Sequence, residues 1–418
     1  MSRFCAFALI VVVSAQAALA TNYTFTSTTS NLRWNVPTAW TPNGYPSTFN
    51  DTAIIPGVAT AFTVNSDTLG SNPILLSSLT LGTATTATRA GAVSIGNGTF
   101  NCPGFEFPDG GVITEYCNAL DKIYGSITAD GQLTVNIPTV AQYTNLYFDG
   151  TINGPGSVIK DGLGSMLYNC NVPNTYTGQT WVKSGRLYLS GSAGMQYIGS
   201  GGLKMTGTGR IQWNSNDHIL DTAPIEMGDS ANLALPAGMS EAMGAFTLDS
   251  GNPVIWGAAG STYRFADSTA ATWATDGTLT LETYNSSLFP TVYFGTNSSG
   301  LTAAQLSHIK FTDTTTGLTY PVGFDASNTG LLVAITHTYW SADFNHDFVV
   351  SFKDYIILEG NFGKSGATNA MGDADGDGLV TFKDYIALES QFNKTSSPEP
   401  ATIGLLVAGG LALLRRKA

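Results

Sequence analysis

Two acidic stretches near the C-terminal end of the sequence hold the residues that could bind a metal ion. Both place oxygen-bearing side chains at positions 1, 3, 5, 9 and 12 of a loop: Asp343, Asn345, Asp347, Ser351 and Asp354 in the first, and Asp373, Asp375, Asp377, Thr381 and Asp384 in the second. Calcium takes about six to eight oxygen ligands, and this alternation allows a short loop to surround it. The position-7 carbonyls of Val349 and Leu379 would add a backbone ligand to each site. The spacing predicts two bound calcium ions.

A helix is expected directly after each loop. Both loops run into the same F-K-D-Y-I sequence, and position 12 is Asp where the usual calcium loop has Glu. A tandem pair of loops that end in Asp and lead into one helix each resembles a type I dockerin. Tyr355, Leu358 and Phe362 share one helix face, and the second copy repeats them, so the helices could pack around a small core that metal binding completes. The alternative is a pair of solvated acidic turns between helices.

The resemblance to dockerins also implies a partner surface. In that family the residues at loop positions 10 and 11 help to contact a cohesin. Here those residues are Phe352, Lys353, Phe382 and Lys383. Because the same pair occurs twice, the surface would be pseudo-twofold and could bind a cohesin-like partner in two orientations. The alternative places both phenylalanines in the core of the helix pair and both lysines in solvent.

The C-terminal tail has three parts. Pro398, Glu399 and Pro400 precede an apolar run at 403–414, and Arg415 and Arg416 follow that run. This order resembles the PEP-CTERM sorting signal of Gram-negative bacteria that export surface polymers. The resemblance implies processing by an exosortase-type membrane protease and a C-terminal hydrophobic helix in the membrane, with the basic cluster on the cytoplasmic side. A plain C-terminal membrane anchor is the alternative.

The N-terminal segment is expected to be a secretory signal. Arg3 precedes an apolar run at 4–13, and Ala18-Leu19-Ala20 fits a cleavage site, so that residues 1–20 would be removed. An oxidising compartment would allow a disulfide between Cys102 and Cys117, with Cys170 left unpaired. Three buried free thiols are the alternative.

Residues 21–338 are expected to form a β-rich region. Short runs of β-branched and aromatic residues alternate with Gly, Asn, Asp and Pro turns, and one short helix is expected at 302–308. Clear examples of such runs are 61–65, 74–81, 133–137, 181–189 and 279–284. Their spacing suits a sandwich or a barrel, and it also suits a parallel β-helix.

Three stretches favour the β-helix. The sequence from 38 to 55 resembles the opening segment of secreted bacterial β-solenoids, in which Trp40 would cap the first coil. The stretch at 150–189, with N-T-Y-T-G at a corner, resembles the autotransporter-associated β-strand repeat. The stretch at 279–311 resembles the closing module that precedes a surface anchor. Together they imply a right-handed parallel β-helix, with a β-sandwich within this region as the alternative.

These expectations divide the chain into a signal peptide, a solenoid-like region, a small α dockerin-like module at 339–394 and a sorting tail at 395–418. An insertion at 101–122, with Glu106, Asp109, Glu115 and Asp121, is expected to stand off one face as a loop. Long loops often carry functional residues, although a surface excursion tied by the disulfide is the simpler interpretation.

The function expected from the sequence is non-catalytic. H-E-x-x-H, G-x-S-x-G and C-x-x-C do not occur, and a net charge of −12 argues against nucleic-acid partners, because phosphates require Lys/Arg clusters. We expect a secreted or cell-surface protein at the envelope of a Gram-negative, exopolysaccharide-producing bacterium. The alternative is an extracellular polysaccharide-degrading glycoside hydrolase or lyase, or a carbohydrate-binding protein.

Overall fold

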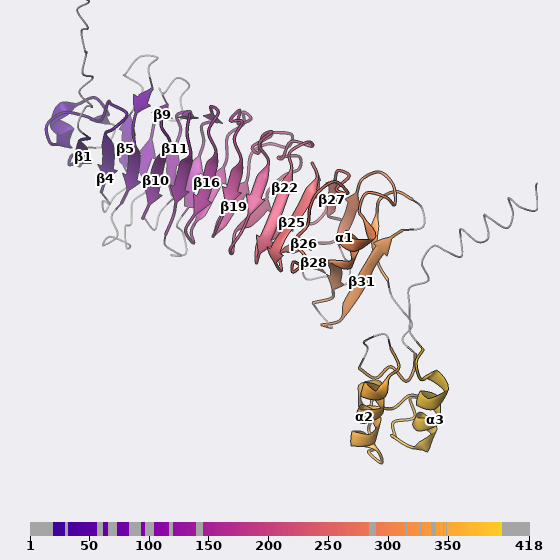
Figure 1. The fold of residues 1–418 in the computed structure, drawn as a ribbon. Helices are drawn as coiled ribbons and strands as arrows, with labels where there is room; N and C mark the ends of the chain where they lie inside the picture. The colour runs from indigo at the N-terminus through magenta and orange to yellow at the C-terminus, as the bar shows by residue number, and fades with distance from the viewer. Residues whose placement is uncertain are drawn as a thin grey trace, which may run out of the picture. The chain divides into compact units, whose positions relative to one another are not determined.

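The computed structural model forms two compact units, which divide between Val333 and Ala334. It describes residues 20–29, 32–56, 62–65, 73–82, 93–96, 104–116, 120–138, 145–283, 290–314, 317–325, 328–335, 340–345, 347 and 349–394. Within these ranges the first unit consists mainly of short β-strands, and the second contains the helices α2 (Phe352–Asn361) and α3 (Phe382–Gln391) (Figure 1).

The first unit is a parallel β-solenoid whose strands stack in ladders along its faces (Figure 1). In the described ranges the longest sheet has the order β2 (Leu32–Arg33), β5 (Phe62–Asn65), β8 (Val93–Ile95), β11 (Leu120–Ile123), β14 (Asn145–Phe148), β17 (Ser165–Tyr168), β19 (Arg186–Leu189), β21 (Arg210–Trp213), β23 (Asn232–Leu235), β26 (Val254–Gly257), β28 (Leu279–Thr283), β30 (Ile309–Thr312), β31 (Thr319–Phe324) and β32 (Leu332–Ala334).

A second long sheet forms another face. Its order is β25 (Phe246–Gly251), β22 (Ile225–Asp229), β20 (Leu203–Met205), β18 (Thr180–Val182), β16 (Val158–Asp161), β13 (Leu133–Asn136), β10 (Gly111–Glu115), β7 (Ser78–Leu81), β4 (Thr52–Ile55), β1 (Asn22–Phe25) and β3 (Trp40–Thr41). Two shorter sheets contain β15 (Ile152–Asn153), β12 (Ile127–Ala129), β9 (Phe105–Phe107) and β6 (Ile74–Leu75), and β24 (Ser240–Met243), β27 (Thr262–Phe265) and β29 (Thr291–Phe294).

Successive coils pair in register. Val158 pairs with Thr180, Thr180 with Leu203, and Leu203 with Ile225, so each of these coils takes 22 or 23 residues. Along strands such as β13 and β19, alternate side chains point inward and are buried, as the two-residue period of a strand requires. The parallel stacking confirms the β-helix interpretation in its coarse form, and the sandwich alternative is wrong for the part of the chain that the structure describes.

The corners between strands depend on particular polar and small residues. In the N-T-Y-T-G stretch, the buried amide of Asn174 accepts a hydrogen bond from the Ile152 N–H at 2.8 Å and donates one to the Tyr197 carbonyl at 3.2 Å, so it joins three coils. At another corner Gly185 has φ +67°, and a Cβ there would lie 2.4 Å from the Gly162 carbonyl oxygen. Only glycine fits that close approach without strain.

The first coil is closed by tryptophans. The strand β3, which follows the short helix η1 (Pro37–Ala39), pairs antiparallel with β1 at the end of its sheet, and it carries Trp40. The indole of Trp40 is buried against Phe25 and Trp34 and donates a hydrogen bond to the Trp34 carbonyl at 2.8 Å. Trp40 therefore lies where the expected capping residue should lie.

Two local predictions differ from the structure, and a third is confirmed. The stretch at 101–122 is not an excursion, because β9, β10 and β11 belong to three different sheets of the solenoid. Its acidic residues Glu115 and Asp121 are fully buried. The sequence pattern alone does not show that a charged residue lies in the interior. The run at 181–189 is not one strand: it contains the last two residues of β18 and the whole of β19, separated by a corner at Gly185. The expected helix at 302–308 is confirmed as α1 (Ala303–Ser307), with Thr302 and Gln305 forming a capping box.

The second unit has a small core of its own. Buried apolar side chains come from both loops and both helices: Ala342, Phe344, Val350, Leu358, Ala367, Val380 and Leu388. Leu358 and Leu388 point into this core as predicted, but Phe362 and Phe392 do not, because each helix ends one residue earlier and leaves these rings exposed. A short helix, η2 (Asn369–Met371), connects the two halves.

Several predicted features fall outside the described residues. These are the signal peptide apart from Ala20, the sorting motif with its apolar run and arginines, and both Cys102 and Cys117. Cys170 is a buried free thiol. Among the helices that the structure describes, none combines the length and the apolar character needed to cross a bilayer.

Candidate metal centres

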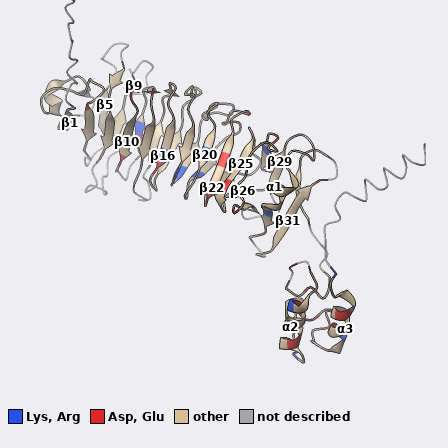
Figure 2. Cartoon of the chain, viewed as in Figure 1, with Lys and Arg blue, Asp and Glu red and all other residues tan. Residues whose placement is uncertain are grey.

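Each loop of the second unit brings three carboxylates together. In the first loop these are Asp343, Asp347 and Asp354, and in the second they are Asp373, Asp375 and Asp377. Within each group one oxygen per residue lies within 4.8 Å of the others. Figure 2 shows Asp and Glu on both helices as well. The carboxylates at loop positions 1 and 5 thus converge in both copies, as the spacing predicted, and in the first copy position 12 joins them.

The position-12 aspartates close the loops from the first turn of each helix. Ser351 and Thr381 are the N-caps of α2 and α3, and each forms a capping box with the aspartate three residues later. Asp354 also accepts hydrogen bonds from the N–H groups of Phe344 at 2.8 Å and Asn345 at 3.1 Å. The carboxylate therefore ties the beginning of the loop to the beginning of the helix.

The second loop repeats this arrangement. Asp384 accepts hydrogen bonds from the N–H groups of Ala374 at 2.7 Å and Thr381 at 2.7 Å, and it is fully buried. Burial alone would raise the pKa of Asp384, but these backbone hydrogen bonds outweigh it and hold the pKa below its ordinary value. The carboxylate is thus ionised at neutral pH.

The position-1 aspartates organise the middle of each loop. Asp343 accepts a hydrogen bond from the Asp347 N–H at 3.2 Å, and Asp373 accepts hydrogen bonds from Gly376 at 2.8 Å and Gly378 at 2.9 Å. Gly378 has φ +81°, which a glycine adopts without strain at the sharp turn of position 6. Its counterpart Phe348 lies outside the described residues.

The remaining predicted ligands lie at the rims of the loops. At position 3, Asn345 donates to the Asp347 carboxylate at 3.0 Å, while Asp375 is itself a member of the second carboxylate group. At position 7, the N–H groups of Val349 and Leu379 donate to Asp347 and Asp377, which leaves their carbonyls as possible ligands. Ser351 and Thr381, at position 9, are engaged in capping and fit an indirect, water-mediated role.

The lysines at position 11 lie against the loops. Lys353 pairs with Asp347 at 3.0 Å, and Lys383 pairs with Asp377 at 3.2 Å. The lysine side chains are largely exposed. Together with the Asn345 amide, Lys353 holds the pKa of Asp347 below its ordinary value although burial opposes the shift. Each ammonium partly neutralises a carboxylate that a metal ion would also contact.

The donor set fits a hard divalent cation. All converging side-chain groups are oxygens, and three carboxylates within 4.8 Å repel one another unless a cation offsets their charge. Asp343 and Asp373 have 0% and 4% of their surface exposed, so water screens this repulsion poorly. Oxygen-only ligation favours calcium or magnesium over zinc, and a flexible loop that mixes carboxylates with carbonyls is typical of calcium.

The predicted partner residues are exposed in part. Phe352 and Phe382 have 64% and 65% of their surface exposed, so the alternative is wrong in placing them in the helix core, although the lysines lie in solvent as it expected. Each ring stacks on the tyrosine three residues later, Tyr355 or Tyr385, at 5.5 Å between ring centroids. Phe352 also lines a hollow of about 280 Å³, together with Tyr355, Tyr385, Leu388, Glu389 and Phe392.

The solenoid also contains a buried polar cluster whose residues match none of the sequence motifs considered above. The Ser215 hydroxyl lies 2.7 Å from Nε2 of His218, and the Glu241 carboxylate accepts hydrogen bonds from the N–H groups of His218 and Ile219. Burial lowers the pKa of His218 and raises that of Glu241 to about 8. Because His218 is fully buried, a substrate could not reach the contact between Ser215 and His218. We assign this cluster a structural role.

Comparison of the chain with protein-family models, with curated proteins and with solved structures finds no significant match.

Proposed function

We propose that this protein is a non-catalytic secreted or cell-surface protein of a Gram-negative bacterium, in which a β-solenoid is displayed outside the cell. A calcium-stabilised, dockerin-like unit would follow the solenoid and precede a C-terminal sorting tail. The observation that carries this proposal is the repetition of one loop-and-helix design with three converging carboxylates in each copy. Both copies have the same capping box and the same lysine contact, which supports the same metal-binding role for both loops.

Calcium would act as a structural element in this proposal. The core of the second unit is small, and units of this size gain much of their stability from metal ligation. When bound, calcium would supply the positive charge that holds Asp343, Asp347 and Asp354 together, and likewise the aspartates of the second loop. The chain's own residues shape the loops, because Asp354 and Asp384 fix the loop entrance to the helix start.

Limited proteolysis of the whole chain tests this role. With calcium we expect trypsin to leave 340–394 intact, whereas with EDTA it should cleave after Lys353, Lys364 or Lys383 while the solenoid persists. The matched control carries both Asp347→Ala and Asp377→Ala and should be cleaved in either condition. Equal cleavage of the wild-type chain with and without calcium would refute the structural role.

The processing of the two ends is a separate part of the proposal. It rests on the signal-like segment at 1–20 and on the Pro398-Glu399-Pro400 tail with Arg415 and Arg416. We expect the protein to be found at the cell envelope without residues 1–20, held by its tail or released by an exosortase-type protease. Intact-mass analysis that finds the whole chain in the cytoplasm would refute this.

A cohesin-like partner is also part of the proposal. Phe352 with Lys353, and Phe382 with Lys383, form two equivalent exposed pairs at the helix starts. We expect that Lys353→Glu combined with Lys383→Glu abolishes capture of a purified partner. Lys364→Glu, which lies beyond the end of α2, should not affect that capture. If both variants retain the same partner, the surface has another role.

A further inference from the structure

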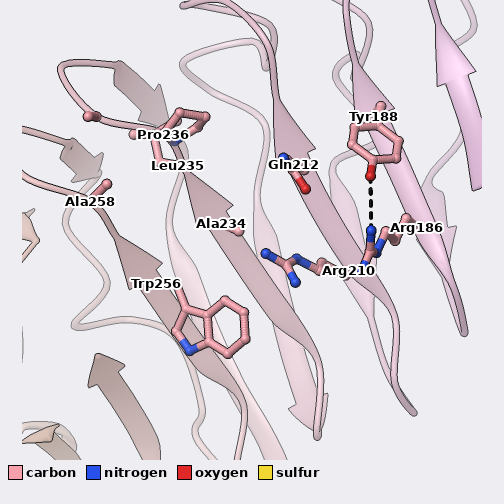
Figure 3. Close-up of a pocket in the computed structure, with 10 residues that line it drawn as sticks. Arg186, Tyr188, Arg210, Gln212, Ala234, Leu235, Pro236, Trp256 and Ala258 are labelled. Carbon is pink, nitrogen blue, oxygen red and sulfur yellow. Dashed lines mark hydrogen bonds between the residues drawn. The ribbon is translucent and has the colours of Figure 1, made fainter. Parts of the chain in front are cut away.

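One face of the solenoid contains a hollow of about 440 Å³ that the proposed function does not use (Figure 3). Strands β19, β21, β23 and β26 form its base, and the turn after β23 forms one end. The residues that line it are Arg186, Tyr188, Arg210, Gln212, Ala234, Leu235, Pro236, Ala237, Trp256 and Ala258. Two of these carry positive charge and none carries negative charge, on a chain whose net charge is −12.

The hollow arises from the register of the coils. Tyr188, Gln212, Ala234 and Trp256 occupy one outward row, because each pairs with the next across neighbouring strands. Ala234 is the small member of this row, so the larger side chains on either side form walls above it. Three rung spacings of ~4.8 Å separate Tyr188 from Trp256, which gives a groove of roughly 14 Å along the solenoid.

Two arginines stand in adjacent rungs of the same face. Arg186 pairs in register with Arg210, and like charges directly opposite each other on a sheet are unfavourable. Their positions are nevertheless defined, because Arg186 donates a hydrogen bond to the Tyr188 hydroxyl at 3.1 Å and the Arg210 guanidinium lies 4.6 Å from the centre of the Trp256 ring (Figure 3). An anionic ligand between the guanidinium groups would remove the repulsion.

Trp256 is itself held in place. Its indole N–H donates to the Glu282 carboxylate at 2.5 Å, and Glu282 is the next member of the same outward row, beyond Trp256 as seen from Ala234. The ring is partly exposed, so it presents apolar surface to the groove together with Tyr188. Aromatic rings of this kind pack against the apolar C–H faces of sugars, and guanidinium groups bind carboxylates through paired N–H donors.

From this arrangement we infer that the groove binds an acidic polysaccharide, a linear polymer of sugars that carry carboxylates. An acidic peptide fits less well. Extended peptides are usually bound through main-chain hydrogen bonds at a sheet edge, whereas each strand under this groove is already paired on both sides. The binding groups here are side chains of a sheet face, which suits a polymer of rings. The inference does not depend on calcium binding, because the groove lies within the solenoid unit.

Titration of the whole chain with short oligogalacturonates, followed by saturation-transfer NMR, tests this inference. EDTA is present throughout, so that calcium cannot bridge the ligand to the acidic loops. We expect binding of the acidic oligomers, weaker binding at high salt, and no comparable binding of neutral galactose oligomers. Arg186→Gln and Arg210→Gln should each weaken binding by about tenfold, the usual effect of losing a charge-assisted hydrogen bond.

The matched control is Arg264→Gln. Arg264 makes a similar contact with an aromatic ring, Tyr293 at 4.0 Å, but it lies on a different sheet. This variant should bind the acidic oligomers as the wild type does. If Arg210→Gln unfolds the chain, the exposed Arg186→Gln variant still gives a result. The inference is overturned if the acidic oligomers do not bind, if neutral oligomers bind equally, if Arg264→Gln weakens binding as much, or if poly-glutamate binds more tightly.

Discussion

The Asp384 carboxylate accepts a hydrogen bond from the backbone N–H of Ala374 at 2.7 Å and thereby joins the first turn of α3 to the start of the second acidic loop. Asp354 makes the equivalent contact with Phe344 at 2.8 Å in the first loop. Helix capping and loop closure are therefore performed by one side chain in each copy. A change at this side chain should affect the helix and the metal site together.

Replacing Asp384 by Ala should destabilise α3 even without calcium. The substitution removes the acceptor of the partly buried N–H groups of Ala374 and Thr381, and each lost hydrogen bond costs about 1 kcal/mol. We expect faster amide hydrogen exchange in α3, measured in EDTA by mass spectrometry. Glu389→Gln, on the exposed side of the same helix, is the control and should leave exchange unchanged. Equal protection of α3 in the Asp384→Ala and wild-type chains would contradict this role.

The same contact predicts how acid affects the second unit. The folded pKa of Asp384 lies below its ordinary value of 3.8, so the unfolded chain binds the proton more readily. The carboxylate's contribution is therefore complete above the unfolded pKa and is lost as pH falls through the folded pKa. Protection of α3 in EDTA should decline below about pH 4. The Asp384→Asn variant should show a smaller decline, and an equal decline in both chains would exclude this residue as the cause.

The lysines at loop position 11 should weaken calcium binding. Lys353 and Lys383 contact carboxylates that calcium would also use, so Lys353→Met and Lys383→Met should each increase calcium affinity severalfold at low salt. High salt should remove this gain, because the lysines are exposed and screened. Lys364→Met is the control, since its ammonium group contacts Asn361 and lies outside the loops. A decrease in affinity in the loop variants would show that the lysines support the sites.

A buried lysine should make the solenoid's stability depend on pH in the alkaline range. Lys160 stands in an inward column between Val135 and Val182, and burial lowers its pKa to about 7, although three backbone carbonyls accept hydrogen bonds from its ammonium group. Between about pH 7 and 10.5 the unfolded chain binds more protons than the folded chain, so stability should rise with pH across that window.

Thermal unfolding followed by circular dichroism measures that rise. Lys160→Met should reduce the slope of melting temperature against pH between 7 and 10 relative to the wild type, whatever its effect on stability at a single pH. The comparison of slopes separates the titration of Lys160 from that of the exposed lysines and tyrosines, which both chains share. An identical slope in the two chains would mean that Lys160 remains protonated in the folded state.

The strands were predictable from local sequence pattern, but that pattern left the sandwich and the barrel open, and the resemblance of three stretches favoured the β-solenoid. Leu133 and Val135 point inward as their spacing predicts, and Trp40 and Asn174 lie at the expected cap and corner. The stretch at 101–122 was misinterpreted because charged residues usually mark solvent. Asp121 instead lies in the interior, where its carboxylate accepts a hydrogen bond from the Val93 N–H at 2.7 Å.

The metal loops were predictable for a different reason. The ligands of each loop lie within one short segment, so no contact between distant parts of the chain is needed to bring them together. Asp354 was expected to close the first loop where a helix begins, and it does so within a capping box with Ser351. The groove on the solenoid could not be predicted in this way. Arg186, Arg210 and Trp256 come from three separate coils. They lie close together only because the length of each coil sets the register between neighbouring strands, and local sequence does not reveal that length.

The two calcium sites should differ in affinity, with the second the tighter. Its loop provides four carboxylates, whereas Asn345 replaces one of them in the first loop, and affinity follows ligand charge and rigidity. Gly378 also adopts the positive φ of the sharp turn without strain, and the first loop has Phe348 at that position. The first site should therefore fill last, and α2 should exchange faster than α3 at low calcium.

Calorimetric titration of the whole chain with calcium tests the central claim most directly, with Asp347→Ala and Asp377→Ala as paired variants. We predict two binding events in the wild-type chain, loss of the weaker event in Asp347→Ala and loss of the tighter event in Asp377→Ala. If Asp347→Ala instead removes the tighter event, the order of the sites is wrong. A wild-type chain that binds no calcium, or that binds it equally after both substitutions are combined, would contradict the assignment of these loops as metal centres.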